Sequence, residues 1–118
     1  MLRKLIAAAF FLLSVNAANA ASRVWISEFR TLGSTASSQA QIAAIPSLRN
    51  QSTLDISGGV QSSAAFGSDT TFIRIICEVQ CAIKGGGTAT TSDTLLPALS
   101  PEYFGVQAGA TISVIAAP

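Results

Sequence analysis

The most strand-like stretch of the sequence reads Thr71-Phe72-Ile73-Arg74-Ile75-Ile76-Cys77. Along it, Phe72 and Arg74 alternate with isoleucines. This period of two is the pattern of a strand that turns one face to the core and leaves the other partly exposed. Most of the residues are β-branched or aromatic, the types that are enriched in strands. The stretch therefore predicts a strand that lies inside a β-sheet.

Short apolar runs separated by turn residues lie on both sides of this stretch. They cover residues 23–29, 52–56 and 60–66 before it, and residues 80–84, 94–96, 102–106 and 111–115 after it. Ser57-Gly58-Gly59 predicts the turn of a hairpin between 52–56 and 60–66, and 80–84 is expected to follow 71–77 as its partner strand. With no convincing helix, the pattern predicts an all-β fold, a single small antiparallel β-sandwich or jelly-roll-like barrel.

The segment from residue 31 to residue 50 has no comparable pattern. It consists largely of Ser, Thr, Ala and Gln, with Pro46 near its C-terminal end. Residues 39–45 are long enough for one helical turn, but nothing nearby caps it well. We predict a long connection. Loops of this length in compact domains are often functional or disordered, and one role for this one is an arm that reaches a neighbouring subunit.

The N-terminus has the form of an export signal. Arg3 and Lys4 form a basic start, residues 5–15 are apolar, and Ala18-Asn19-Ala20 has the small residues that signal peptidases recognise. We predict that residues 1–20 are a signal peptide, cleaved between Ala20 and Ala21. An apolar N-terminal extension that stays on the protein, or a start placed ahead of the true one, are the alternatives.

Residues 21–118 are expected to form the β-domain, and their composition limits the partners. They hold five basic and six acidic residues, and the basic ones are scattered singly, so no patch favours nucleic acid. No apolar run approaches the roughly 20 residues of a membrane-spanning helix, so no membrane contact is expected after leader removal. The 14 Ser and 10 Thr predict a hydroxyl-rich surface, which suits an extracellular or virion setting.

Cys77 and Cys81 are candidates for a disulfide. In a straight strand, residues four apart lie about 13 Å from each other, whereas the Cα atoms of a disulfide are roughly 4.4 to 6.8 Å apart. A bridge therefore requires a turn at Glu78-Val79-Gln80, which would make the two cysteines a cross-strand pair of a hairpin. The alternative is two reduced cysteines that pack as small apolar residues.

The residue inventory argues against catalysis. The chain has no histidine, the most frequent general base and metal ligand, and its two cysteines cannot complete a zinc site. The carboxylates lack calcium-loop spacing. Lys84 precedes the glycines of Gly85-Gly86-Gly87 instead of following them, so this is a turn and not a phosphate loop. We predict no catalytic, cofactor-binding or metal site, and no enzyme.

Aromatic residues are the remaining candidates for a binding surface. In the strand predicted at residues 23–29, Val24, Ile26 and Phe29 are assigned to the apolar face and Trp25 to the other. We expect Trp25 to pack against a neighbouring segment, with an exposed interface position as the alternative. Tyr103 and Phe104 are expected to divide between the core and an adjacent turn, with a surface for sugars or subunits as the alternative.

The order of these segments resembles a family of small structural proteins encoded beside capsid genes in tailed bacteriophages. The resemblance covers residues 23–116 and is carried by 23–29, 61–66, 71–75, Cys81 with the strand after it, Thr88-Ala89-Thr90, Pro101-Glu102-Tyr103-Phe104-Gly105-Val106 and Ile112-Ser113-Val114-Ile115. Its motifs are structural. It implies a virion component of the decoration or cement type, associated with the head, that acts through repeated contacts with copies of itself or with other virion proteins.

Two features depart from this family. Capsid components assemble in the cytoplasm, so an export leader does not belong on them, and Cys77 is additional to the single cysteine of the pattern. The sequence therefore leaves two hypotheses. One is a multi-copy virion protein, and the other is an exported periplasmic or extracellular binding or adhesive domain.

Overall fold

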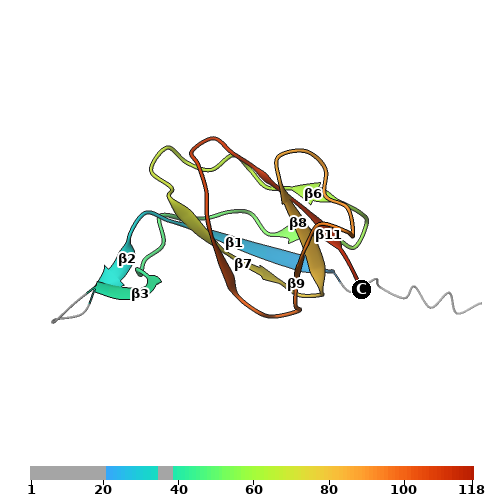
Figure 1. Cartoon of the computed structure of the whole chain (residues 1–118), viewed down its shortest axis with the longest axis horizontal. Coiled ribbons are helices and arrows are strands. Elements are labelled where there is room, and N and C mark those ends of the chain that lie inside the picture. Colours follow the sequence, from blue (N-terminus) through green and yellow to red (C-terminus); the bar gives the residue numbers. More distant parts are fainter. Residues whose placement is uncertain (1–20, 35–38) are drawn as a thin grey trace, which may run out of the picture.

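The computed structural model describes residues 21–34 and 39–118, with side chains described for 21–33 and 43–118. The predicted signal peptide, including Ala20 of its cleavage site, lies outside these residues. All regular elements of the described part are strands (Figure 1). It contains no helix that is long and apolar enough to cross a membrane.

Most of the strands form two antiparallel sheets. The first, which we call the β1 sheet, has the order β10-β7-β1-β4, with β5 also paired to β1. Its strands are β1 (Arg23–Phe29), β4 (Arg49–Asn50), β5 (Leu54–Asp55), β7 (Phe72–Cys77) and β10 (Glu102–Gly105). The second, the β11 sheet, has the order β6-β11-β8-β9, with β6 (Gln61–Ser62), β8 (Cys81–Gly85), β9 (Thr94–Leu96) and β11 (Ile112–Ala116).

The core lies between the inner faces of these two sheets. Ile73 and Ile75 of the β1 sheet are fully buried, as is Val114 of the β11 sheet, and all three belong to one apolar cluster. Burying such a side chain contributes about 1.5 to 3 kcal/mol. Along β7 the residues alternate between partly exposed and buried, so the predicted strand is confirmed. The all-β prediction is confirmed as well, in its sandwich form.

The segment predicted as a long connection instead contains strands. Among the described residues, β2 (Leu32–Ser34) and β3 (Gln39–Ala43) pair only with each other, and they form a projecting hairpin that extends away from the sandwich beyond the end of β1 (Figure 1). The backbone N–H of Ala44 donates to the carbonyl oxygen of Thr31 at 3.4 Å, which brings the two ends of the hairpin together. The prediction failed because backbone pairing needs no apolar alternation, and this segment has little.

The predicted hairpin between residues 52–56 and 60–66 is also wrong. β5 pairs with β1, whereas β6 pairs with β11, so the two strands belong to different sheets. The turn between them carries the chain from one sheet to the other. The Asp55 carboxylate accepts bonds from the Ser57 backbone N–H at 3.0 Å and its hydroxyl at 2.7 Å, and Gly59 has a φ of 133°, which favours glycine. The turn residues thus predicted the position of the bend correctly, but they did not show which sheet the chain enters after it.

Candidate functional site

One charged side chain, that of Glu28, is fully buried in the described part of the chain. Glu28 follows Val24 and Ile26 at the next inward position of β1. The prediction that Phe29 shares a face with Val24 and Ile26 is therefore wrong, although Phe29 is buried. Phe29 lies opposite Phe72 on the outer face, where their ring centroids are 5.3 Å apart. The period of two along β1 contained this signal, because it assigns the even-numbered positions to one face.

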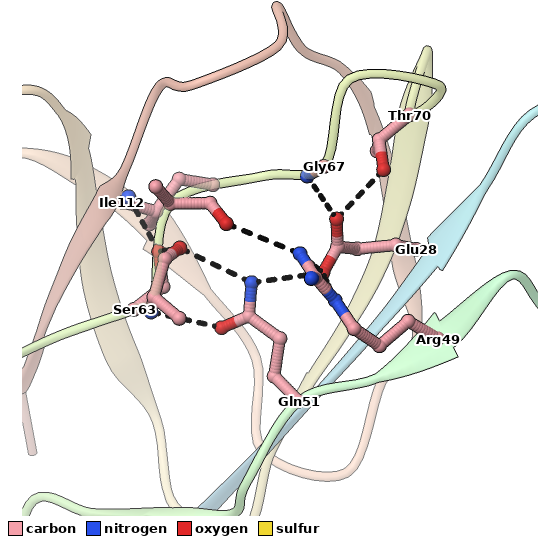
Figure 2. A network of polar contacts seen from close by, with 9 residues as sticks. Glu28, Arg49, Gln51, Ser63, Gly67, Thr70 and Ile112 are labelled. Atoms are coloured by element: carbon pink, nitrogen blue, oxygen red, sulfur yellow. Dashed lines mark hydrogen bonds and ion pairs between the residues drawn. The ribbon is translucent and has the colours of Figure 1, made fainter.

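Four donor groups saturate the carboxylate of Glu28 (Figure 2). Oε1 accepts from the Gly67 backbone N–H at 2.8 Å and from the Thr70 hydroxyl at 2.7 Å. Oε2 accepts from Arg49 Nε at 2.7 Å and from Gln51 Nε2 at 3.2 Å. Arg49 Nη2 lies 2.6 Å from the same oxygen. Because both oxygens are occupied and solvent does not reach them, the carboxylate is held as a structural anion.

The partners of Glu28 join the edges of the two sheets. Arg49 Nη2 donates to the carbonyl oxygen of Ala65 at 3.1 Å. Gln51 donates to the carbonyl oxygen of Ala64 at 3.2 Å and accepts from its N–H at 3.0 Å. Arg49 lies in β4, at the edge of the β1 sheet, and Ala64 and Ala65 follow edge strand β6 of the other sheet. We call this network, with Glu28 at its centre, the Glu28 seam. It closes one side of the sandwich.

Acid is expected to weaken the Glu28 seam. Burial raises the pKa of Glu28, but hydrogen bonds from Thr70, Gly67, Arg49 and Gln51 outweigh it and hold the pKa below the ordinary value of 4.5. A lowered folded-state pKa stabilises the protein fully above the unfolded value, and this stabilisation is lost as pH falls through the folded one. We expect the urea midpoint to decrease below about pH 4.5.

The control for this pH dependence is Glu28→Gln, which has no carboxylate at the seam. Hydrogen bonds also hold the pKa values of Asp55, Glu78 and Asp93 below their ordinary values. These groups act in both proteins, so the difference between the two pH curves isolates Glu28. Parallel curves would contradict the expectation.

The candidate disulfide is present, and it connects the two sheets. Cys77 ends β7 and Cys81 begins β8, and their sulfurs are bonded, with 6.3 Å between the Cα atoms. The expected cross-strand hairpin pair is wrong, because β7 and β8 belong to different sheets. Both cysteines are almost completely buried. The bridge therefore closes the tight turn by which the chain passes from the β1 sheet to the β11 sheet.

The outer face of the β1 sheet carries aromatic and arginine side chains. The register places Trp25 opposite Ile76, and Arg74 opposite Tyr103. Trp25, Ile76 and Arg74 are partly exposed, and Tyr103 is 50% exposed. We call these residues, together with Phe72, the aromatic–arginine face. Phe104 packs against the core, so Tyr103 and Phe104 divide between the two sides of the sheet and Tyr103 takes the surface.

Arg23 contacts the ring of Trp25 at the edge of this face. Its guanidinium carbon lies 5.3 Å from the centre of the Trp25 ring, within the range of a cation–π contact. The same guanidinium donates through Nε and Nη2 to the two carboxylate oxygens of Glu78, each at 3.1 Å. This forked pair restricts the rotamers of Arg23. The pair with Glu78 thus orients the guanidinium that contacts the Trp25 ring.

The outer face of the β11 sheet is partly covered by its own chain. Ala82 and Ser113 point outward from β8 and β11, yet both are buried. The connection between β8 and β9 lies over them, and the buried Ala89 donates its backbone N–H to Ser113 Oγ at 2.9 Å. The cover is incomplete, because Leu95 of β9, opposite Ala82 in the register, is 52% exposed.

The side of the sandwich opposite the Glu28 seam is open. Its edges are β10 and β9, and a groove of about 700 Å³ is bordered by residues of both strands. The core residues Phe66, Ile83 and Ile112 line it, together with the partly exposed Phe104 and Val106.

Neither the apolar groove nor the polar Glu28 seam resembles a metal centre. Within residues 21–34 and 39–118, no group of three His, Cys, Asp or Glu side chains could hold a metal ion. Comparison with known proteins gives no match to a family model, to a curated protein or to a solved structure. Function must therefore be inferred from the aromatic–arginine face, the projecting hairpin, the groove and the disulfide.

Proposed function

We propose that this chain is a non-catalytic structural protein that works in many copies, as a head-associated decoration or cement-like component of a tailed-phage virion. The observation that carries the proposal is the aromatic–arginine face. Trp, Tyr and Arg are the residues that dominate the binding energy of protein interfaces. Here they lie together on a sheet face that the rest of the described chain leaves partly exposed. The projecting hairpin and the order of sequence segments that resembles phage structural proteins give further support.

A truncation on this face tests the interface. Tyr103 lies opposite Arg74 in the register and is half exposed. We expect Tyr103→Ala to lower the affinity of the protein for particles at least tenfold, about 1.4 kcal/mol, because an aromatic anchor is removed. The number of copies bound per virion, counted in phage particles that are produced with the variant gene, measures this loss of affinity. The matched control is Leu95→Ala, since Leu95 is 52% exposed but lies in β9 of the other sheet. Equal occupancy for both variants would contradict an interface at the aromatic–arginine face.

The disulfide favours a second candidate function, an exported periplasmic or extracellular binding domain. Disulfides persist in oxidising compartments and are rare in the cytoplasm, where virion heads assemble. The leader predicted at residues 1–20 supports the same location. In this case the aromatic–arginine face would bind a cell-surface or extracellular partner.

Intact-mass spectrometry of the protein from its native source separates the two functions. Purified virions and the periplasmic fraction are measured with and without reduction. A full-length or leader-less chain in purified particles supports the virion role. A chain that begins at Ala21 in the periplasm, two hydrogens lighter than its reduced form and missing from particles, overturns that role and supports the exported domain.

A further inference from the structure

A row of four polar side chains crosses the outer face of the β1 sheet. Tyr103 of β10 lies opposite Arg74 of β7. Arg74 in turn lies opposite Ser27 of β1, which is paired with Asn50 of β4. Residues directly opposite each other in antiparallel strands point to the same side of the sheet. The row, which we call the polar row, therefore places a phenol, a guanidinium, a hydroxyl and an amide on one surface.

Three members of the polar row, Ser27, Asn50 and Arg74, line a hollow of about 270 Å³. Phe29 and residues 45–47 form its other walls. The segment is attached to the sheet next to this point, since the backbone N–H of Leu48 donates to the carbonyl oxygen of Glu28 at 2.9 Å. The outward-facing Ser27 and Phe29 are both buried. The outer face of the sheet is thus recessed here.

Arg74 is the charged residue of this hollow, and its own chain supplies no counter-ion. Within the described residues no carboxylate lines the hollow. The ion pairs found there join Arg23 to Glu78 and Arg49 to Glu28, so they leave Arg74 out. Its side chain is only partly exposed, which limits the water that can reach its five N–H donors. Arg74 is therefore placed to receive an acceptor from another molecule.

The neighbours of Arg74 favour an anion as that acceptor. The Ser47 hydroxyl donates to Asn50 Oδ1 at 3.1 Å, so the acceptor of this amide is occupied and its NH₂ group is left to donate. The hydroxyls of Ser27 and Tyr103 lie in the same row and are donors as well. A carboxylate accepts two parallel hydrogen bonds from a guanidinium. The set of groups around Arg74 thus matches a carboxylate.

The apolar walls of the hollow indicate which carboxylate fits. Ile45 is 94% exposed at its rim, and Pro46 beside it is exposed too. With Phe29 they form a surface that methylene groups can cover. The hydroxyls of a sugar acid would lose their hydrogen bonds to water against such walls. An acidic protein side chain, which has a carboxylate on an aliphatic stem, is therefore favoured over an acidic sugar.

We propose that the hollow binds the carboxylate of a glutamate or aspartate side chain from the partner protein. Arg74 donates to both carboxylate oxygens, Asn50 adds a further donor, and Ile45 and Pro46 are covered by the partner. The inference rests on the proposed function, in which the aromatic–arginine face is an interface, and it specifies the chemistry at the centre of that face. An ion pair that the partner shields from water contributes to specificity as well as to affinity.

Propionate, a carboxylate with a short apolar tail, is the probe for the hollow. Nuclear magnetic resonance follows the side-chain N–H signals of the full-length protein at constant ionic strength. We expect propionate to shift the Arg74 signal in a saturable way, and propionamide, which has a similar shape and no charge, to leave it in place. Arg30 is the internal control, because it is exposed and lies outside the hollow. Equal shifts at both arginines would overturn the site.

Glucuronate tests the alternative ligand in the same experiment. Tighter binding of glucuronate than of propionate would overturn the acidic side chain in favour of an acidic sugar. The Asn50 amide signal provides a second reading. Propionate should shift it in the wild-type protein and in Arg30→Gln but not in Arg74→Gln.

The partner is tested with phage particles that are produced with variant genes. We expect Arg74→Gln to lower the affinity for particles about tenfold or more, whereas the matched control Arg30→Gln should bind like the wild-type protein. Arg74→Lys should lie between them, because it keeps the charge but loses the forked pair of donors. Melting temperatures should stay unchanged in all three variants, since neither Arg74 nor Arg30 forms an ion pair among the described residues.

The outcomes separate this inference from the proposed function. If Arg74→Gln binds particles like the wild-type protein while Tyr103→Ala is weakened, the aromatic–arginine face is an interface but the carboxylate contact is wrong. If the chain is missing from particles, the virion function fails. The titrations then decide alone: a saturable shift at Arg74 that requires charge, with propionate bound at least as tightly as glucuronate, supports the site, and its absence overturns it.

Discussion

Replacing Glu28 with glutamine is expected to lower the free energy of unfolding by about 3 kcal/mol, because breaking a buried ion pair costs roughly 3 to 5 kcal/mol. The lower end applies since Arg49 is half exposed and can be solvated when its partner changes. A glutamine at this position presents an NH₂ group in place of one carboxylate oxygen. On one side it meets the N–H of Gly67, and on the other the donors of Arg49 and Gln51. Either orientation sets donor against donor.

Urea unfolding at neutral pH measures this effect, and Glu78→Gln is its matched control. Glu78 also pairs with an arginine, Arg23, but both side chains are substantially exposed. Exposed ion pairs contribute little to stability, because water screens them. The same chemical change should therefore have a much larger effect at Glu28 than at Glu78. Equal losses of stability would mean that the seam does not hold the two sheet edges together.

Removing the disulfide is the second large expected effect. The bridge closes a loop with a sequence separation of 4, for which the chain-entropy relation gives about 2 kcal/mol. We expect the double substitution Cys77→Ala with Cys81→Ala to lower the free energy of unfolding by about that amount. For a domain of this size, the melting temperature falls by roughly 4 to 8 °C per kcal/mol. The decrease should thus be about 8 to 16 °C.

Reduction provides the control for this experiment. A reducing agent should lower the melting temperature of the wild-type protein but leave that of the double variant unchanged. It should also release two thiols from the wild-type protein once it is unfolded. If the double variant melts at the wild-type temperature, the link between the sheets at Cys77 and Cys81 contributes nothing to stability.

The prediction of strands succeeded where a strand buries one face along its own length. In β7, Ile73 and Ile75 alternate with partly exposed residues, so a local pattern reports the burial directly. The same rule would have identified Glu28 as an inward residue, but the apolar character of Phe29 led to its assignment to that face instead. Burial of the carboxylate is tolerated because segment 67–70 and the edge at Arg49 and Gln51 bring hydrogen-bond donors to it.

The local sequence pattern could not predict which strands pair with each other. Turn residues at Ser57-Gly58-Gly59 and around Glu78 indicated bends, yet each bend leads into the other sheet instead of back along the same one. The local sequence does not distinguish a turn within one sheet from a turn between two sheets, because both contain similar residues. The hairpin of β2 and β3 was missed because its pairing is made by backbone groups, which every residue carries.

The sequence determined the all-β class, the inward positions of β7 and the pair of cysteines able to form a bridge. These depend on side-chain type and on a period of two, which are properties of a short stretch of chain. Tertiary structure assigned the strands to sheets, closed one side of the sandwich with the Glu28 seam and left the other open beside β9 and β10. These features depend on contacts between residues far apart in the sequence, whose energies are settled only when the whole chain packs.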